Sequence, residues 1–230
     1  MRITPLTDHV TQLTRLGLMN AYLVREDDGL TLVDTMSRGS ARALRSAAEE
    51  LDAPIRRIVL THGHADHVGS VDALREALGD DVALLAPARD ARIMAGDKRM
   101  DEGERRLRGG WPKVHARPDA TLEPGGRVGS LEVVAAPGHT PGQVALLDTR
   151  DRVLLCGDAF HAMGGLAVCG QMTWSFPLVA LATWDPALSV ATARALTELR
   201  PSVLCPGHGR ALRDPQTEME AAVTAAERAR

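Results

Sequence analysis

The sequence predicts an α+β protein built from two similar halves, and three observations support that fold class. Strands followed by a helix occur twice along the chain, turns rich in Gly and Pro separate these elements, and no low-complexity linker divides the halves. The chain has 230 residues, of which 44% are hydrophobic and 25% charged, as in an ordinary globular protein. We therefore expect a single domain over residues 1–230, with its two sheets packed face to face.

The first half opens with a predicted hairpin. Residues 20–26 and 30–35 are rich in β-forming side chains, and the Asp27-Asp28-Gly29 turn sequence separates them. The spacing of apolar residues then predicts a helix, a buried strand, a second helix and a short strand, over residues 40–51, 55–61, 68–78 and 82–86.

The segment over residues 88–119 differs from the rest of the chain because it is dense in charge and poor in aliphatic side chains. One interpretation is a solvated helix and loop. The other is a lid or insertion that faces the substrate, since long ordered loops are often functional.

The second half repeats the design of the first. Three short strands are followed by a helix, a fourth strand and a last helix, over residues 131–135, 143–148, 152–156, 186–199, 203–205 and 215–228. Asp185 is the expected N-cap of the first of these helices, with Pro186 at its first position. We expect Asp214 and Pro215 to cap the last helix in the same way.

Composition and charge exclude several classes of function. The formal net charge of −3 gives no electrostatic reason to expect nucleic acid or an acidic membrane surface as a partner. No signal-like leader opens the chain, and no apolar run approaches the roughly 20 residues needed to span a bilayer. Cys156, Cys169 and Cys205 are odd in number and form no CxxC, so we expect buried thiols and a cytoplasmic protein.

Histidines gather at one point in the sequence. Three of the eight fall in the run His62-Gly63-His64-Ala65-Asp66-His67, directly after a predicted strand. Several imidazoles and a carboxylate would be costly to bury together unless a cation organised them. This HxHxDH run therefore predicts a metal site.

Three more polar residues follow predicted strands of the second half. They are His139 in PGHTPG, Asp158 in CGD and His208 in PGHG, and each is flanked by Gly or Pro that allow a sharp turn. The candidate ligands then number seven, whereas one zinc ion takes about four. Two ions roughly 3.5–4 Å apart can use them all if one carboxylate bridges, and they would bring the pKa of bound water from about 16 towards 7.

The motifs THGHADHVG, PGHTPG, CGDA and PGHG, in this order, resemble those of the metallo-β-lactamase superfamily, and the resemblance covers nearly the whole chain. It implies a four-layer αβ/βα sandwich with the site at the rim between the sheets. It also implies a catalytic duty for Asp66, which would orient the nucleophile or receive a proton, and a supporting position for Asp34 behind the ligands. By the same resemblance His62, His64 and His139 bind the first metal, Asp66, His67 and His208 the second, and Asp158 bridges them.

Departures from individual branches narrow the expected activity. True β-lactamases of this fold generally lack the bridging aspartate, so Asp158 disfavours antibiotic hydrolysis. The pattern is nearer to hydroxyacylglutathione hydrolases and lactonases, which predicts cleavage of a carboxylic ester, thioester or lactone by dinuclear metal-bound hydroxide. Yet the glutathione hydrolases carry a further C-terminal region that this sequence lacks after His208, and the active-site tyrosine of the lactonases is missing because Tyr22 is the only tyrosine.

A second hypothesis is a mononuclear iron dioxygenase that acts on persulfides, since two histidines and a carboxylate suit ferrous iron. A third is a metal-dependent scaffold without catalysis. Zinc is the expected metal, with manganese or iron as alternatives, and the expected partner is a small-molecule substrate, with a homodimer left open. The walls of its pocket are expected from residues 88–119 and 160–184, with Trp111, His115, Met163, Met172, Trp174 and Phe176 as candidates.

Overall fold

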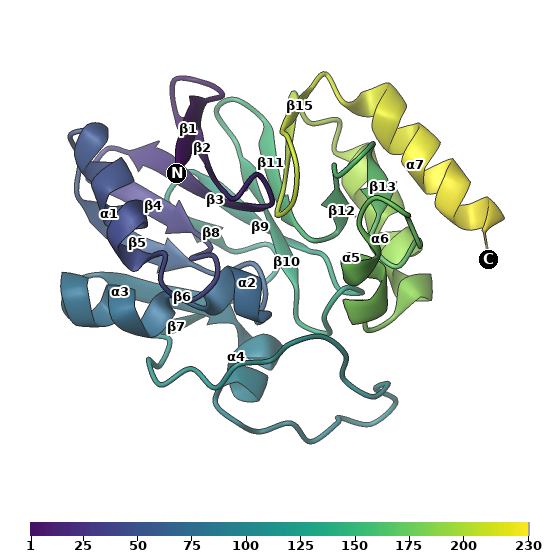
Figure 1. Cartoon of the computed structure of the whole chain (residues 1–230), viewed down its shortest axis with the longest axis horizontal. Helices are drawn as coiled ribbons and strands as arrows, with labels where there is room; N and C mark the ends of the chain where they lie inside the picture. The colour runs from purple at the N-terminus through teal and green to yellow at the C-terminus, as the bar shows by residue number, and fades with distance from the viewer. Residues whose placement is uncertain (230) are drawn as a thin grey trace.

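The computed structural model describes residues 1–229 and shows two sheets packed face to face, with helices over both outer faces (Figure 1). The N-terminal sheet has seven strands and the C-terminal sheet has six. The predicted α+β fold class and the four-layer αβ/βα arrangement are therefore confirmed.

The N-terminal sheet runs from β1 to β7 in chain order. Its first four strands are antiparallel neighbours, and from β4 onwards the pairing is parallel. The strands are β1 (Arg2–Pro5), β2 (Val10–Arg15), β3 (Met19–Glu26), β4 (Gly29–Val33), β5 (Ile55–Val59), β6 (Ala83–Pro87) and β7 (Ala120–Leu122). The predicted hairpin is present as β3 and β4.

Four helices follow strands of this first sheet: α1 (Ala41–Glu50), α2 (Ala65–Val68), α3 (Val71–Leu78) and α4 (Ala88–Met94). The helix predicted over residues 68–78 is wrong at its start, because the chain breaks between α2 and α3. Ser70 Oγ explains the break, since it accepts a hydrogen bond from Ser40 N at 2.9 Å and donates one to Ser37 O at 2.8 Å.

The C-terminal sheet brings the ends of three strands to one edge. Both β9 and β11 are antiparallel to β10 and thus parallel to each other, and β14 is parallel to β11. The sheet consists of β8 (Arg127–Val128), β9 (Leu131–Ala135), β10 (Val144–Asp148), β11 (Val153–Gly157), β14 (Val203–Pro206) and β15 (Leu212–Arg213). The remaining elements are the β12 (Phe160–His161) and β13 (Ala167–Val168) pair and the helices α5 (Pro177–Ala182), α6 (Pro186–Glu198) and α7 (Gln216–Arg228).

The predicted helix caps have opposite outcomes. Asp185 caps α6, because its side chain accepts hydrogen bonds from the backbone N–H groups of Ala187 and Leu188 at 2.9 and 3.1 Å. The predicted Asp214 cap of α7 is wrong: Pro215 is the N-cap residue and has no side-chain cap bond. Asp214 instead has a positive φ of 47°, so it belongs to the turn before the helix.

Alternate residues along the strands fill different layers of the core. Leu32 on β4 faces α1 and α3, whereas its neighbour Val33 packs against the opposite sheet. On β10, Leu146 contributes to the core between the sheets and Leu147 packs with α6 and α7. Because both faces of these strands are buried, most of their side chains are apolar on both faces, with Thr31 on β4 and Asp148 on β10 as polar exceptions.

The charged segment over residues 88–119 forms α4 and then a long irregular chain, which extends below α4 in Figure 1. Its tip is exposed, but residues 108–111 return to the ligand-bearing loop, where Ala65 N donates to Gly110 O at 2.9 Å. Within residues 1–229, no helix is long and apolar enough to cross a membrane.

Candidate metal centre

The structure brings all seven predicted ligands together at the rim between the sheets. His62 and His64 lie on the loop that leaves β5, and Asp66 and His67 lie on the single turn of α2. The other three follow the ends of β9, β11 and β14, and these are His139, Asp158 and His208. Potential ligand atoms form three overlapping groups within 4.8 Å, namely His62–His64–His139, His62–His67–Asp158 and Asp66–His67–His208.

Asp34 orients the two histidines nearest to it. His67 Nδ1 donates to Asp34 Oδ2 at 2.8 Å, because a carboxylate can only accept. Thr61 Oγ1 donates to the same oxygen at 2.8 Å and therefore accepts from His62 Nδ1 at 3.0 Å. Both histidines then turn Nε2 towards the centre of the cluster, where it could bind a metal ion. Asp34 thus lies where the sequence expected a supporting carboxylate.

His139 and His208 are oriented in the same manner by oxygen atoms behind them. Thr183 Oγ1 donates to Val179 O at 2.7 Å and so accepts from His139 Nδ1 at 3.1 Å. His208 Nδ1 donates to the Leu18 carbonyl at 3.0 Å. In each ring the hydrogen bond places a proton on Nδ1, so Nε2 is the inward nitrogen that could bind a metal ion.

His64 has the reverse orientation, and this creates a contact that needs a cation. Its Nε2 donates to the Arg108 carbonyl at 3.1 Å, so its Nδ1 carries the lone pair. That Nδ1 lies 2.9 Å from His139 Nε2, whose lone pair also points inward. Two lone pairs at this distance repel each other, and a shared metal ion would convert the repulsion into two ligand bonds.

Burial and the neighbouring charges set the protonation of the cluster. Burial lowers the pKa of His62 well below its usual value, and it lowers the pKa of His139 to about 3. Burial also acts to lower the pKa of His208, but the charge of Asp158 and hydrogen bonds to both aspartates raise it to about 10. For Asp158 burial raises the pKa, yet the charges of His208 and His67 hold it well below its usual value. The carboxylates therefore stay ionised beside positive charge, which is the role a divalent cation would take.

Asp158 occupies the middle of the cluster. Its Oδ1 lies 3.3 Å from His67 Nε2, and its Oδ2 lies 3.4 Å from His139 Nε2 and 3.2 Å from His208 Nε2. Gly207 leaves this space open, since a Cβ there would overlap Asp158 Oδ1 and the His67 ring. Three buried atoms, His62 Nε2, His67 Nε2 and Asp158 Oδ1, have no hydrogen-bond partner among the described residues. Orphaned atoms of this kind, facing one another, fit divalent metal ions.

The comparisons with known proteins agree with this geometry. The family model described as "Metallo-beta-lactamase superfamily" matches residues 15–208. The chain belongs to the metallo-beta-lactamase superfamily. It is 40% identical over 234 residues to "Uncharacterized protein YobT" of Bacillus subtilis, a match that covers 99% of this chain and 100% of that protein.

Other members of the superfamily have lower sequence identity to this chain. Hydroxyacylglutathione hydrolase GloC of Haemophilus influenzae is 31% identical over 154 residues, which is 63% of this chain and 68% of that one. The structure of the metallo-beta-lactamase FIM-1 from Pseudomonas aeruginosa superposes with a TM-score of 0.73 at 21% identity, over 99% of this chain and 95% of that one. This likeness shows the superfamily fold.

Asp90, which connects two of the ligand loops, was not predicted from the sequence. Asp90 on α4 is fully buried, and its Oδ2 accepts from Gly63 N at 2.9 Å and from Thr140 Oγ1 at 2.7 Å. Its Oδ1 accepts from Gly142 N at 2.9 Å. One carboxylate therefore ties the loop of His62 and His64 to the loop of His139. The sequence signal is weak, because Asp90 lies in the first turn of a helix inside a segment with many other charges.

The candidate wall residues do not all reach the site. Phe176 lines the cavity beside the ligands, and the Trp111 ring lies 4.9 Å from the His64 ring. Trp174 is fully exposed and, with Met163, borders a different hollow, whereas His115 borders a hollow next to Asp66. Met172 is 60% exposed and lines none of these hollows.

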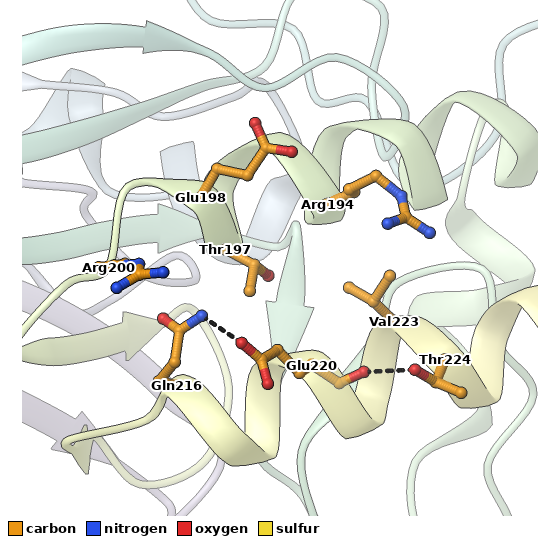
Figure 2. A pocket seen from close by; sticks show the side chains of 8 residues that line it. All are labelled: Arg194, Thr197, Glu198, Arg200, Gln216, Glu220, Val223 and Thr224. Carbon is orange, nitrogen blue, oxygen red and sulfur yellow. Dashed lines mark hydrogen bonds between the residues drawn. The ribbon is translucent and has the colours of Figure 1, made fainter.

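A further hollow of about 440 Å³ lies between α6 and α7, and Figure 2 shows its side chains. Both polar contacts drawn there are internal to α7, since Gln216 Nε2 and Thr224 Oγ1 each donate to Glu220, at 2.6 and 2.8 Å. None of its described lining residues belongs to the metal cluster, so the candidate site of this superfamily member is the rim between the sheets.

Proposed function

We propose that the protein hydrolyses a carboxylic ester, thioester or lactone of a small molecule, with two divalent metal ions held by the seven clustered side chains. Zinc is the first candidate for both ions, with manganese and iron as alternatives. The observation that carries the proposal is the set of five imidazoles whose outer nitrogens are all engaged in hydrogen bonds, so that each inner nitrogen is left for a metal ion beside Asp158 and Asp66.

Asp66 is the ligand that a substrate can reach. Its side chain is 40% exposed, whereas those of His208 and Asp158 are at most 3% exposed. Burial raises the pKa of Asp66, but a hydrogen bond from His208 and the charge of His67 hold it below its usual value. An ionised carboxylate at the cavity wall can orient an attacking water and accept its proton at a carboxylate oxygen.

When bound, divalent ions at this cluster would lower the pKa of water from about 16 towards 7 and would polarise the substrate carbonyl. The chain itself supplies orientation. His62, His67 and Asp34 are fixed by hydrogen bonds of 2.8–3.0 Å, so the ligand atoms need little rearrangement. The proton taken up at Asp66 can then pass to the leaving alcohol or thiol.

The deciding experiment is metal analysis of protein purified without added metal or chelator, joined to a screen of esters, thioesters and lactones. We expect about two zinc or manganese ions per chain and turnover of at least one substrate class. The His64→Ala variant should lose bound metal and lower turnover by orders of magnitude, and unchanged turnover in that variant would reject the site.

The same experiment tests the dioxygenase hypothesis. About one iron ion per chain, with uptake of dioxygen in the presence of a persulfide, would favour that hypothesis over hydrolysis. Two ions with no turnover of any ester, thioester or lactone would support a metal-dependent scaffold.

A further inference from the structure

The cavity beside the metal cluster is lined, apart from the ligands, mostly by apolar side chains. It has a volume of about 310 Å³ and is shared by His64, Asp66, His139, Asp158 and His208. This volume lies at the lower end of ligand cavities, which run from about 300 to 1,000 Å³. Apart from Ala65 and Gly110, the rest of the lining is apolar side chains, namely Leu18, Met19, Phe176, Leu178, Val179 and Ala182.

Away from the metal cluster, the described wall of this cavity offers no charged side chain to receive a negatively charged substrate group. Neither Lys nor Arg occurs among its described lining residues, and its two carboxylates belong to the metal cluster. An anionic group placed against the apolar wall would lose its hydration without gaining a partner. A neutral aliphatic group would instead gain about 4-fold in affinity for each methylene that it buries.

Helix α5 forms the apolar wall and is connected to the ligands. Val179 is buried against the core, and its carbonyl accepts from Thr183 Oγ1, which in turn holds His139. On the same wall, the Phe176 ring lies 4.9 Å from the His208 ring. A group packed on α5 therefore lies directly beside the reacting centre and not at a remote subsite.

A second hollow that borders Ala65 and Asp66 is chemically different. It has a volume of about 720 Å³ and shares these two residues with the cavity but is lined by Arg38, Lys113 and His115 as well as acidic groups. Asp66 thus borders both the apolar cavity and a polar hollow, which would give a substrate two distinguishable ends.

We propose that the α5 side takes the acyl part of the substrate, and that this acyl group is uncharged and aliphatic. The inference rests on the proposed hydrolytic function and names its substrate class. It excludes substrates with a carboxylate on the acyl side and directs polar leaving groups towards the side of Lys113.

The first test is a series of p-nitrophenyl esters with acetyl, butyryl, hexanoyl and glutaryl acyl groups. We expect kcat/KM to rise about 4-fold per methylene from acetyl to hexanoyl, and we expect the glutaryl ester to react at least about 10-fold more slowly than the hexanoyl ester. A flat series, or a glutaryl ester as good as the hexanoyl ester, would overturn the proposal.

Two exposed leucines of α5 offer a matched pair of variants. Leu178 is 63% exposed and lines the cavity, whereas Leu181 is 58% exposed and does not line it. Leu178→Arg should raise the ratio of glutaryl to hexanoyl turnover about 10-fold or more, because it places a cation at the cavity rim. Leu181→Arg should leave the ratio unchanged, and an equal shift in both variants would contradict a role for the cavity.

A binding measurement separates this inference from the proposed function. Acetyl, hexanoyl and glutaryl hydroxamates are titrated into zinc-loaded protein by calorimetry, because they carry the same acyl groups without a cleavable ester. If no ester, thioester or lactone is hydrolysed but the hexanoyl compound binds best, the proposed function fails and the acyl cavity stands. Equal affinity for all three, or no binding of any, would overturn the acyl cavity itself.

Discussion

The two sheets contribute to the metal cluster in different ways. The N-terminal sheet supplies His62, His64, Asp66 and His67 from one loop and one helical turn after β5. The C-terminal sheet supplies single residues after the ends of β9, β11 and β14, spread along the chain from His139 to His208. The first set is positioned by local backbone geometry, and the second set by the order and direction of strands.

This difference predicts how substitutions in the two sets of ligands will affect the site. Ligands on one turn share a backbone, so a change there acts mainly on the atoms it removes. Ligands from three strand ends meet only because the sheet is assembled, and Asp158 at their centre contacts histidines from both sheets. We therefore expect the C-terminal set to couple the two metal positions and the N-terminal set to divide between them.

Asp158→Ala should have the largest effect. We expect occupancy of both metal positions to fall together, with turnover reduced by more than the roughly 10–100-fold typical of losing a residue behind a ligand. Metal analysis and steady-state kinetics on the same preparation measure both. Loss of one ion with full retention of the other would contradict the bridging position and would weaken the contrast between the sheets.

Asp34→Asn should have the second largest effect, because one amide oxygen cannot accept from both Thr61 N and His67 Nδ1, although every ligand stays in place. The positive φ of Asp34, 61°, is one that Asn adopts readily, so the backbone is preserved. We expect metal affinity to fall about 10–100-fold at the position of His67, measured by competition with a chelator. Asp28→Asn, in the exposed turn between β3 and β4, is the matched control and should leave affinity unchanged.

Asp90→Asn tests how far the two sheets depend on each other, because Asp90 connects ligand loops of both sheets. An amide in its place would direct an N–H group at a backbone donor, either Gly63 N or Gly142 N. We expect a loss of about 1–3 kcal/mol in the free energy of unfolding, measured in urea. Asp101→Asn, in the exposed part of the same segment, should change it by less than about 0.5 kcal/mol. Equal losses in both variants would argue against the connection.

The smallest expected effect is a pH dependence of the difference in free energy of unfolding between the wild type and Asp90→Asn. Burial raises the pKa of Asp90 to about 6, although three hydrogen bonds act to lower it. A pKa above the unfolded value of about 4 means that this contribution to stability is complete below pH ~4 and is lost as pH rises through ~6. The advantage of the wild type over Asp90→Asn should therefore shrink by about 1 kcal/mol from pH 5 to 7.5. An advantage that grows over this interval would show that the hydrogen bonds dominate.

The same contrast explains what could be predicted from the sequence. The HxHxDH run is visible because its residues are adjacent, and the strands after which His139, Asp158 and His208 follow are visible from their apolar runs. The edge strands β1, β7 and β8 were not predicted, since they are only two to four residues long. The buried six-residue strand β2 was not predicted either, because its sequence VTQLTR has no continuous apolar run. Asp90 and Thr183 were missed because their partners lie about 25 to 50 residues away, and only tertiary packing joins them.

The hydrogen bonds of Thr183 to Val179 and His139 couple binding at the α5 wall of the cavity to binding of metal at the cluster. Any compound that packs on α5 and favours the present position of Thr183 also favours the ligand-ready orientation of His139. Because such coupling is reciprocal, the metal must raise the affinity for that compound by the same factor as the compound raises the affinity for the metal. A plentiful substrate would then help the protein retain its ions when free metal is scarce.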